Sequence, residues 1–301
     1  MSGRALVTGL SGFTGFYVAR ELEALGYQVF GLEQEQEAAS PTDTRVAVDL
    51  RDLEALNALV AAVQPNVVVH LAAIAFVGHS DVTDIYTSNV VGTRNLLGAL
   101  ASSAVKPDKV VLASSANVYG NAAVATLDED CPPQPENDYA VSKRAMEIMA
   151  RCWRHELPIV IVRPFNYTGV GQSLSFLLPK LVDHFARGEK RVELGNIDVY
   201  RDFSDVRTVA NAYARLVSGG EPGQVYNICS GAAHCIQDIL DRLAAMAGYS
   251  IQVEVNPAFV RANEVKRLVG SNRRLVAAIG ELEQIPLVDT LKWMYGAQTG
   301  A

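Results

Sequence analysis

Short apolar runs recur through the first half of the chain. Each run is rich in Val and Ile and is bounded by turn residues, which is typical of a strand buried on both faces. Such strands are predicted at Ala5–Thr8, Gln28–Leu32, Val67–Leu71, Lys109–Ala113 and Ile159–Val162. Strands buried on both faces favour a parallel sheet that lies between two layers of helices.

Between these runs, apolar residues recur at the spacing of an amphipathic helix. The segment "TGFYVARELEALG" closes with Gly26 and "LRDLEALNALVAAVQP" stops at Pro65, both typical helix ends. The segments "DIYTSNVVGTRNLLGALASSAV" and "ENDYAVSKRAMEIMARCWRHEL" end before Pro107 and Pro158. Strands that alternate with helices predict an α/β fold, a Rossmann-type doubly wound parallel sheet with helices on both faces.

The second half of the chain is less regular. Its pattern predicts helices at Leu174–Arg187, Val206–Val217, Ile236–Ala247 and Val288–Tyr295, and strands at Arg191–Leu194, Val225–Ile228 and Ile251–Val255. This mixture indicates a smaller lobe that closes over a cleft. We expect residues 1–164 to form the Rossmann domain, which also receives about 204–230. Residues 165–301 then form a discontinuous, mixed α/β C-terminal lobe.

Composition and charge narrow the function classes. The 301 residues carry a net charge of -7, and 49% of them are hydrophobic and 20% charged. Binding to nucleic acid needs clustered Lys and Arg, so this acidic chain is not expected to bind it. The longest apolar stretch, "NVVVHLAAIAFVG", is too short to span a bilayer, and the first strand begins too near Met1 to leave room for a signal peptide.

The cysteines and histidines show no metal-binding pattern. The four cysteines, Cys131, Cys152, Cys229 and Cys235, include no C-x-x-C pair, and the five histidines lack ligand spacing. Free thiols are typical of a reducing compartment. We therefore expect a cytoplasmic protein without a structural metal and without a membrane partner.

The segment "TGLSGFTG" places Gly9, Gly12 and Gly15 between the first strand and the first helix. Gly9 can make the tight turn, Gly12 lets the backbone approach a pyrophosphate, and Gly15 lets helix and strand pack closely. The N-terminus of the helix then offers unpaired N–H groups to the anion. A glycine triplet in this βαβ context predicts dinucleotide binding.

Glu33 ends the second strand, about 18 residues past the last glycine of the loop. A carboxylate there can accept hydrogen bonds from the ribose hydroxyls of adenosine and repels a 2′-phosphate. No Arg follows at once, because the next residues are "QEQE". The sequence therefore favours NADH, with NADPH as the alternative.

Tyr139 and Lys143 are four residues apart on a predicted helix, so their side chains share one face. A neighbouring ammonium is expected to lower the pKa of a tyrosine toward the working range of an acid–base catalyst. Ser114 and Ser115 follow the fourth strand, at the edge of the sheet where ligands bind in open α/β folds. A hydroxyl there can hydrogen-bond the oxygen of a reacting carbonyl or alcohol.

Glycine loop, strand-end serine and Tyr-x-x-x-Lys, in this order, resemble the extended short-chain dehydrogenases/reductases that act on nucleotide sugars. The likeness runs over nearly the whole chain. It implies that Ser115 is the catalytic hydroxyl, that Tyr139 is the proton donor, and that Lys143 holds the nicotinamide ribose and tunes Tyr139. The resemblance further implies cofactor contacts at Gly9, Gly12, Phe13, Thr14, Gly15, Glu33, Asp49, Leu50, Leu71, Ala72, Ala73 and Asn89.

"IVRPFNYTGVGQ", "LGNIDVYRDFSDV" and "FVRANEVKRLVGSNRRL" resemble the GDP-mannose 4,6-dehydratases and the GDP-4-keto-6-deoxymannose reductases. This resemblance implies a GDP-sugar diphosphate bonded by Asn166, with Arg163 as a neighbour. It implies that the C-terminal lobe binds the nucleotide sugar. The implied substrate-binding residues are Asn117, Asn166, Gly195, Asn196, Arg201, Arg261 and Glu264.

The resemblance alone does not specify which reaction the protein catalyses. A 4,6-dehydratase needs an acid after the catalytic hydroxyl, whereas Ala116 and Asn117 follow Ser115 here. The expected reaction is NADH-dependent reduction of the C4 keto group of a GDP-4-keto-6-deoxy-hexose, giving GDP-D-rhamnose or GDP-6-deoxy-D-talose. The alternatives are a 4-epimerase with retained NAD+, a dTDP-4-keto-6-deoxysugar reductase, and a cofactor-binding protein without activity. The family likeness also implies a homodimer through the helices around Asn89 and Tyr139.

Overall fold

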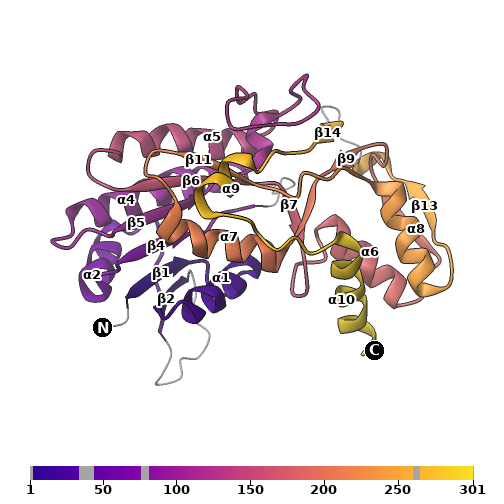
Figure 1. Ribbon diagram of the computed structural model, residues 1–301, viewed down its shortest axis with the longest axis horizontal. Coiled ribbons are helices and arrows are strands. Elements are labelled where there is room, and N and C mark those ends of the chain that lie inside the picture. The colour runs from indigo at the N-terminus through magenta and orange to yellow at the C-terminus, as the bar shows by residue number, and fades with distance from the viewer. Residues whose placement is uncertain (1–2, 34–43, 76–80, 260–264, 301) are drawn as a thin grey trace.

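The central sheet consists of parallel strands in the order β11-β6-β5-β4-β1-β2-β3 (Figure 1). The computed structural model describes residues 3–33, 44–75, 81–259 and 265–300. The strands are β1 (Arg4–Thr8), β2 (Gln28–Glu33), β3 (Arg45–Ala47), β4 (Val67–His70), β5 (Lys109–Ala113), β6 (Ile159–Pro164) and β11 (Val225–Ile228). The order 3-2-1-4-5-6 within this sheet is that of the doubly wound dinucleotide-binding fold, so the predicted fold class is confirmed.

Helices cover both faces of the sheet, because neighbouring residues of each strand point in opposite directions. Val69 and Val111 pack in one core with the helices α1 (Phe13–Ala24), α7 (Val206–Gly219) and α9 (Arg273–Ile279). Val68 and Val110 pack in a second core. The helices on that face are α2 (Leu53–Val63), α4 (Thr93–Ser102) and α5 (Asp138–Ala150).

A third core belongs to the part of the molecule on the right of Figure 1. It is formed by α6 (Leu177–Ala186), α8 (Ile236–Ala247), α10 (Leu287–Thr299) and the parallel pair β8 (Arg191–Leu194) and β13 (Gln252–Val255). Each of these elements was predicted, with ends that differ by a few residues. The mixed α/β character of the C-terminal half therefore follows from its local pattern.

The chain returns to the first sheet after entering the second lobe. β11 pairs with β6, and α7 packs against α1 on the same face of the sheet. These contacts support the predicted return of about 204–230, while the division of the chain at residue 164 stays a prediction.

Short strands join the two lobes and were not predicted. They form the parallel pair β7 (Asn166–Thr168) and β10 (Phe203–Asp205), and the small sheet β12 (His234–Cys235), β9 (Tyr200–Arg201) and β14 (Arg267–Leu268). Two or three residues are too few to display a period of two, so their pairing is set by tertiary contacts. The edge strand β3 escaped prediction for the same reason.

The long helix predicted before Pro107 is broken into three pieces. It begins as α3 (Val82–Tyr86), continues as a π-helix (Thr87–Gly92) and ends as α4. Single π-turns inside α-helices are frequent at functional sites. Short 3₁₀ turns lie at Ala116–Tyr119, Arg151–Trp153 and Pro257–Phe259. Within the described ranges, no helix has the length and apolar character needed to cross a membrane.

Candidate active site

The glycine loop lies between β1 and α1 and has the geometry that its sequence predicts. Gly9 has a φ of 70°, a conformation that side chains disfavour. A Cβ on Gly15 would lie 2.1 Å from the carbonyl oxygen of Gly9, so only glycine lets the helix approach the loop. Gly12 caps α1, and the first N–H groups of a helix have no partner within it. These features fit a dinucleotide pyrophosphate at the start of α1.

Glu33, at the end of β2, faces this loop. Its carboxylate accepts hydrogen bonds from the N–H of Ser11 at 2.5 Å and from its hydroxyl at 2.6 Å. A carboxylate has about four acceptor positions, so Glu33 keeps acceptors for ribose hydroxyls beside the loop. The geometry fits the predicted role of Glu33 without testing it.

The predicted adenosine side of the site contains an arginine that sequence reasoning missed. Asp49 pairs with Arg51 at 2.6 Å, and the Arg51 hydrogen bond lowers the pKa of the Asp49 carboxyl. Leu50 packs against Gly92, where a Cβ would lie 2.9 Å from the Leu50 Cβ. Arg51 is half exposed, and it lies outside the "QEQE" segment that directly follows Glu33.

The strand end at Leu71, Ala72 and Ala73 is fixed by a buried hydrogen-bond chain. The N–H groups of Leu71 and Ala72 donate to Thr8 Oγ1 at 3.2 and 3.1 Å. Thr8 Oγ1 in turn lies 2.7 Å from Nδ1 of His70. Burial lowers the pKa of His70 to about 3, so the imidazole is neutral and serves the scaffold.

Asn89, in the π-helix, fixes the loop that follows β4 through hydrogen bonds to Ile74. Its Oδ1 accepts from the N–H of Ile74 at 2.9 Å, and its Nδ2 donates to the Ile74 carbonyl at 3.2 Å. The same Nδ2 donates to Ser142 Oγ on α5 at 3.0 Å. Asn89 therefore joins the loop after β4 to the helix that carries Tyr139 and Lys143.

Ser115, Tyr139 and Lys143 lie together at the carboxyl end of β5. The Ser115 hydroxyl lies close enough to Tyr139 to act against the rise in the pKa of its phenol. Lys143 Nζ donates to the carbonyl of Ala113 at 2.7 Å. Asn117 follows in the 3₁₀ turn, and its N–H donates to Ser115 Oγ at 3.2 Å. The side chains predicted for chemistry are thus brought together by two separate elements.

The protonation states differ from the expectation. Burial raises the pKa of Tyr139 to about 12, and the Ser115 hydrogen bond offsets this only in part. Burial lowers the pKa of Lys143 to about 8, against the opposing charge of Glu147. The predicted lowering of the Tyr139 pKa by Lys143 is therefore wrong in this arrangement, because desolvation dominates. A tyrosine that stays protonated at neutral pH is suited to donate a proton.

Glu147 and Arg163 form a buried ion pair that sequence reasoning missed. Arg163 Nη2 lies 2.7 Å from Glu147 Oε2, and the two side chains are 3% and 1% exposed. The expectation that Arg163 is a neighbour of the sugar diphosphate is thus wrong, since its guanidinium faces the interior. Its remaining nitrogen donates to Tyr119 Oη at 3.0 Å. A lone Glu on a helix reads as a solvated residue, so no local signal revealed the pair.

The predicted substrate residues that the structure describes lie on several short elements and loops. Asn166 lies on β7, and its buried Nδ2 has no hydrogen-bond partner among the residues that the structure describes, which fits a donor kept for a ligand. Gly195 approaches the carbonyl of Phe259 so closely that a Cβ would lie 2.1 Å from it. Arg201 is on β9, and Asn196 follows Gly195. The predicted residues Arg261 and Glu264 lie outside the described residues.

Tyr167, next to Asn166, connects the two lobes and was not predicted. Its hydroxyl lies 2.7 Å from Thr14 Oγ1 in α1. Its ring stacks on Phe13 with centroids 6.0 Å apart and an interplanar angle of 10°. The predicted cofactor residues Phe13 and Thr14 therefore contact the strand that carries Asn166.

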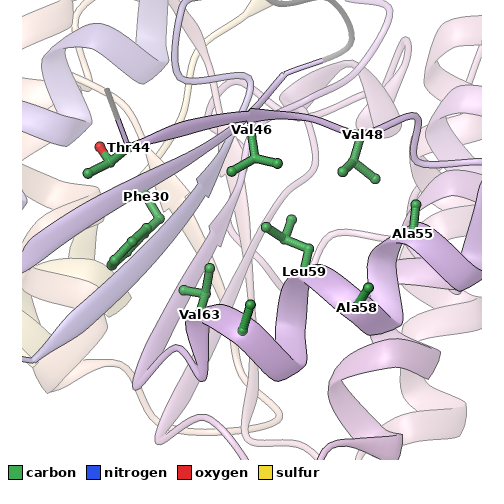
Figure 2. Close-up of a pocket in the computed structure, with 9 residues that line it drawn as sticks. Phe30, Thr44, Val46, Val48, Ala55, Ala58, Leu59 and Val63 are labelled. Atoms are coloured by element: carbon green, nitrogen blue, oxygen red, sulfur yellow. The ribbon is translucent and has the colours of Figure 1, made fainter. Parts of the chain in front are cut away.

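The described surface has an apolar groove at the outer edge of the central sheet. Figure 2 shows an apolar groove between α2 and the outer strands β2 and β3, toward which Phe30, Val46 and Leu59 point. The described residues that line it include no ionisable side chain, so it is a poor place for acid–base chemistry. In the described part of the chain, no group of His, Cys, Asp and Glu is arranged to hold a metal ion.

Comparisons with known proteins indicate the same family as the sequence motifs. Residues 5–229 match the model of the NAD dependent epimerase/dehydratase family. A GDP-6-deoxy-D-talose 4-dehydrogenase of Aggregatibacter actinomycetemcomitans is 32% identical over 92% of this chain and 91% of its own. A GDP-6-deoxy-D-mannose reductase of Pseudomonas aeruginosa is 35% identical over 97% of this chain and 96% of its own.

Solved structures are similar over the whole chain. A putative epimerase from Burkholderia cenocepacia has a TM-score of 0.93 and 50% identity, covering 100% of this chain and 99% of its own. The RMD of Pseudomonas aeruginosa in complex with NADPH has a TM-score of 0.87 and 33% identity, covering 99% of each chain. The family model matches most of the chain, which also has the glycine loop and the residues Ser115, Tyr139 and Lys143. The chain therefore belongs to the NAD dependent epimerase/dehydratase family.

Proposed function

We propose that this protein is an NAD(P)H-dependent oxidoreductase that reduces the C4 keto group of a GDP-4-keto-6-deoxy-hexose. The observation that carries the proposal is the grouping of Tyr139 and Lys143 on α5 with Ser115 at the end of β5, the sheet edge that also carries the glycine loop. Relatives that act on GDP-6-deoxy sugars, at 32% and 35% identity, support the substrate class.

When bound at the glycine loop, the reduced dinucleotide supplies the hydride. Tyr139 donates its proton to the oxygen that develops negative charge at C4. Ser115 hydrogen-bonds the same oxygen and so stabilises the charge as it forms. The ammonium of Lys143 favours the phenolate that remains on Tyr139, and in this role it also holds the nicotinamide ribose.

The substrate-binding side of the proposal uses the lobe junction. Asn166, with its unpartnered Nδ2, is proposed to bond the diphosphate, and Arg201 to pair with it because a guanidinium fits phosphate oxygens bidentately. Asn117 is proposed to contact the sugar, and Gly195 and Asn196 the guanine. Arg261 and Glu264 remain proposed substrate-binding residues, Arg261 for the phosphate and Glu264 for the ribose of GDP.

We expect NADH to bind more tightly than NADPH, by about tenfold, because the Glu33 carboxylate repels a 2′-phosphate in its neighbourhood. Titration of both cofactors by fluorescence checks this, and Glu33→Gln should narrow the difference. Arg51 is the competing cation, half exposed beside Asp49. Tighter binding of NADPH than of NADH, lost in Arg51→Gln, would contradict the preference for NADH. The Arg51 control is needed because the similar Pseudomonas structure contains NADPH.

We expect kcat to decline as pH rises through about 8. Burial lowers the pKa of Lys143 to about 8, so its ammonium is present at neutral pH and is lost above that value, whereas Tyr139 keeps its proton to about 12. Turnover measured from pH 6 to 10, about two units on either side, checks the prediction. A flat profile through pH 9 would argue against an ammonium requirement at Lys143.

The deciding experiment follows NADH oxidation with GDP-4-keto-6-deoxymannose and with the matching dTDP-4-keto sugar, and identifies the product by NMR. Turnover selective for the GDP sugar is the expected result, and the C4 configuration then distinguishes GDP-D-rhamnose from GDP-6-deoxy-D-talose. Turnover of the dTDP sugar alone would overturn the choice of nucleotide.

A 4-epimerase with retained NAD+ is the second candidate, favoured by the 50% identical structure described as a putative epimerase. Both reactions use Ser115, Tyr139 and Lys143, so these residues do not separate them. An epimerase must keep its dinucleotide through each cycle, while a reductase exchanges it at every turnover. Tightly bound dinucleotide in the purified protein, without oxidation of added NADH, would favour the epimerase.

The proposed assembly is a homodimer in the cytoplasm. Val91 on the π-helix and Val141 and Ile148 on α5 are exposed apolar residues of the helices around Asn89 and Tyr139. Burial of such residues between two copies would be favourable, since about 25 cal/mol is gained for each Å² of apolar surface removed from water. Sedimentation analysis of the protein and of Ile148→Glu tests this interface.

A further inference from the structure

The buried carboxylate of Glu147 on α5 bonds to the end of β5 and to β6, next to the proposed catalytic residues. Glu147 lies on α5, four residues after Lys143, and is 1% exposed. Its Oε1 accepts from Ser114 Oγ at 2.6 Å and from Arg163 Nε at 2.8 Å. Its Oε2 accepts from Arg163 Nη2 at 2.7 Å and from Arg144 Nη1 at 2.9 Å. Every acceptor direction of this carboxylate is therefore used.

Two of these donors stand next to proposed active-site residues. Ser114 directly precedes Ser115 at the end of β5, so its hydroxyl ties the strand end to α5. Arg163 lies at the end of β6, three residues before Asn166. One carboxylate thus fixes the backbones that carry Ser115 and Asn166 relative to the helix that carries Lys143.

Stability alone does not explain a pair buried this deeply. Desolvation of two buried charges offsets most of their attraction, and apolar residues of similar volume are often as stabilising. What an ion pair with four directed hydrogen bonds adds is a defined geometry. The arrangement extends further, because Arg163 Nη1 donates to Tyr119 Oη, which donates to Asn227 Oδ1 on β11 at 2.7 Å.

We propose that Glu147 is a positioning residue for the reduction, whose carboxylate holds Ser115, Lys143 and the strand leading to Asn166 in the reactive arrangement. This role rests on the proposed function of the same site. Glu147 acts through its neighbours and does not itself contact the reacting atoms. Its negative charge has a second consequence, because it favours the ammonium form of Lys143 and raises the pKa of that group against burial.

The test compares Glu147→Gln with the wild type. Loss of one acceptor and of the charge should lower kcat about a hundredfold by misplacing the reacting groups, with little change in KM for either substrate. The decline of kcat on the alkaline side should also move to lower pH. Of the charged groups around Lys143, Arg163 on β6 keeps its charge, and buried His70 on β4 is neutral already. The shift of this decline reports the charge of Glu147 near Lys143, and the fall of kcat at pH values where Lys143 is fully protonated reports the positioning.

Two further variants separate charge from geometry. Glu147→Asp keeps the charge but shortens the side chain, so kcat should fall while the alkaline limb stays where it is. Ser114→Ala removes a single hydrogen bond from the cluster and should fold normally. We expect it to lower kcat about tenfold, the cost of one hydrogen bond to a charged group.

Asp205→Asn is the matched control. Asp205 is a buried carboxylate that is also bonded by an arginine through two nitrogens and by a hydroxyl, those of Arg207 and Thr290. The Asp205→Asn variant should lose about as much thermal stability as Glu147→Gln, while its kcat and the pH profile of kcat stay close to those of the wild type. Equal losses of kcat in Asp205→Asn and Glu147→Gln, or normal kcat in both Glu147→Gln and Ser114→Ala, would overturn the positioning role.

Amide hydrogen exchange keeps this test independent of the reaction. Glu147→Gln should speed exchange at residues 113–117 and 164–168. Asp205→Asn should not do so at 113–117, and this segment decides the comparison because β10, which carries Asp205, pairs directly with β7. If the wild type reduces neither 4-keto sugar, the proposed function fails, while exchange still decides whether Glu147 holds these two segments. Unchanged exchange in Glu147→Gln would overturn the positioning role whatever the activity.

Discussion

Tyr139→Phe should bind NADH almost as the wild type does and lose nearly all turnover, with kcat lower by about 10²–10⁴-fold. The substitution removes one hydroxyl from a side chain that is 8% exposed and leaves its ring in place. Without that hydroxyl, the proposed reaction has no proton donor for the C4 oxygen. Stopped-flow measurement of NADH oxidation, with NADH affinity from fluorescence titration, checks both halves of the prediction.

Tyr249→Phe provides the control for this loss. The hydroxyl of Tyr249 donates to the carbonyl of Phe185 at 3.1 Å, within the core of the second lobe. Its removal costs about 1 kcal/mol of stability and should leave kcat unchanged. Near-normal turnover of Tyr139→Phe would remove Tyr139 from the role of proton donor. Equal losses in both variants would show that the effect comes from folding.

Gly15→Ala should weaken dinucleotide binding by about 10²–10⁴-fold, the loss of two hydrogen bonds between backbone N–H groups and a charged pyrophosphate. The added Cβ would lie 2.1 Å from the Gly9 carbonyl oxygen and 2.6 Å from the Leu10 Cα. Both are backbone atoms that cannot rotate away, so the loop must shift and its N–H groups leave the anion site. Fluorescence titration with NADH, with circular dichroism as a check of folding, measures this effect.

Gly98→Ala is the corresponding control. Gly98 lies in α4, and a Cβ there meets only side chains, the nearest being Trp153 at 3.7 Å, which is ordinary contact. Replacement of a helical glycine by alanine should stabilise the protein by up to about 1 kcal/mol without affecting NADH binding. Gly15→Ala that folds and binds NADH like the wild type would contradict the close packing assigned to the loop.

Local pattern was sufficient for the parts of the molecule that repeat over several residues. Val67–Leu71 and Lys109–Ala113 are runs of apolar residues long enough to be recognised as buried strands, and the structure has strands there. The glycines of the loop and the four-residue spacing of Tyr139 and Lys143 are local as well. These features predicted the Rossmann-type sheet and the candidate chemistry before any tertiary contact was known.

Shorter features left no trace in the sequence. The edge strand β3 and the strand β7 have three residues each, and β9 has two, which is below the length at which alternation can be seen. The π-helix at Thr87–Gly92 lies inside a segment whose pattern predicts an uninterrupted helix. Within it, the Asn89 side chain bonds to Ile74 and to Ser142, contacts that a sequence pattern does not show.

The sequence by itself determined the fold class, the dinucleotide loop and the identity of the groups that can carry out acid–base chemistry. Only the tertiary structure decided their protonation and their support. Burial sets the pKa of Tyr139 and Lys143, and burial depends on every element that packs around them. Glu147 and Arg163 meet because α5 and β6 pack together, and a charged residue on a helix carries no mark of a buried partner 16 residues away. Desolvation and long-range pairing are properties of the packed molecule, which is why local pattern could not predict them.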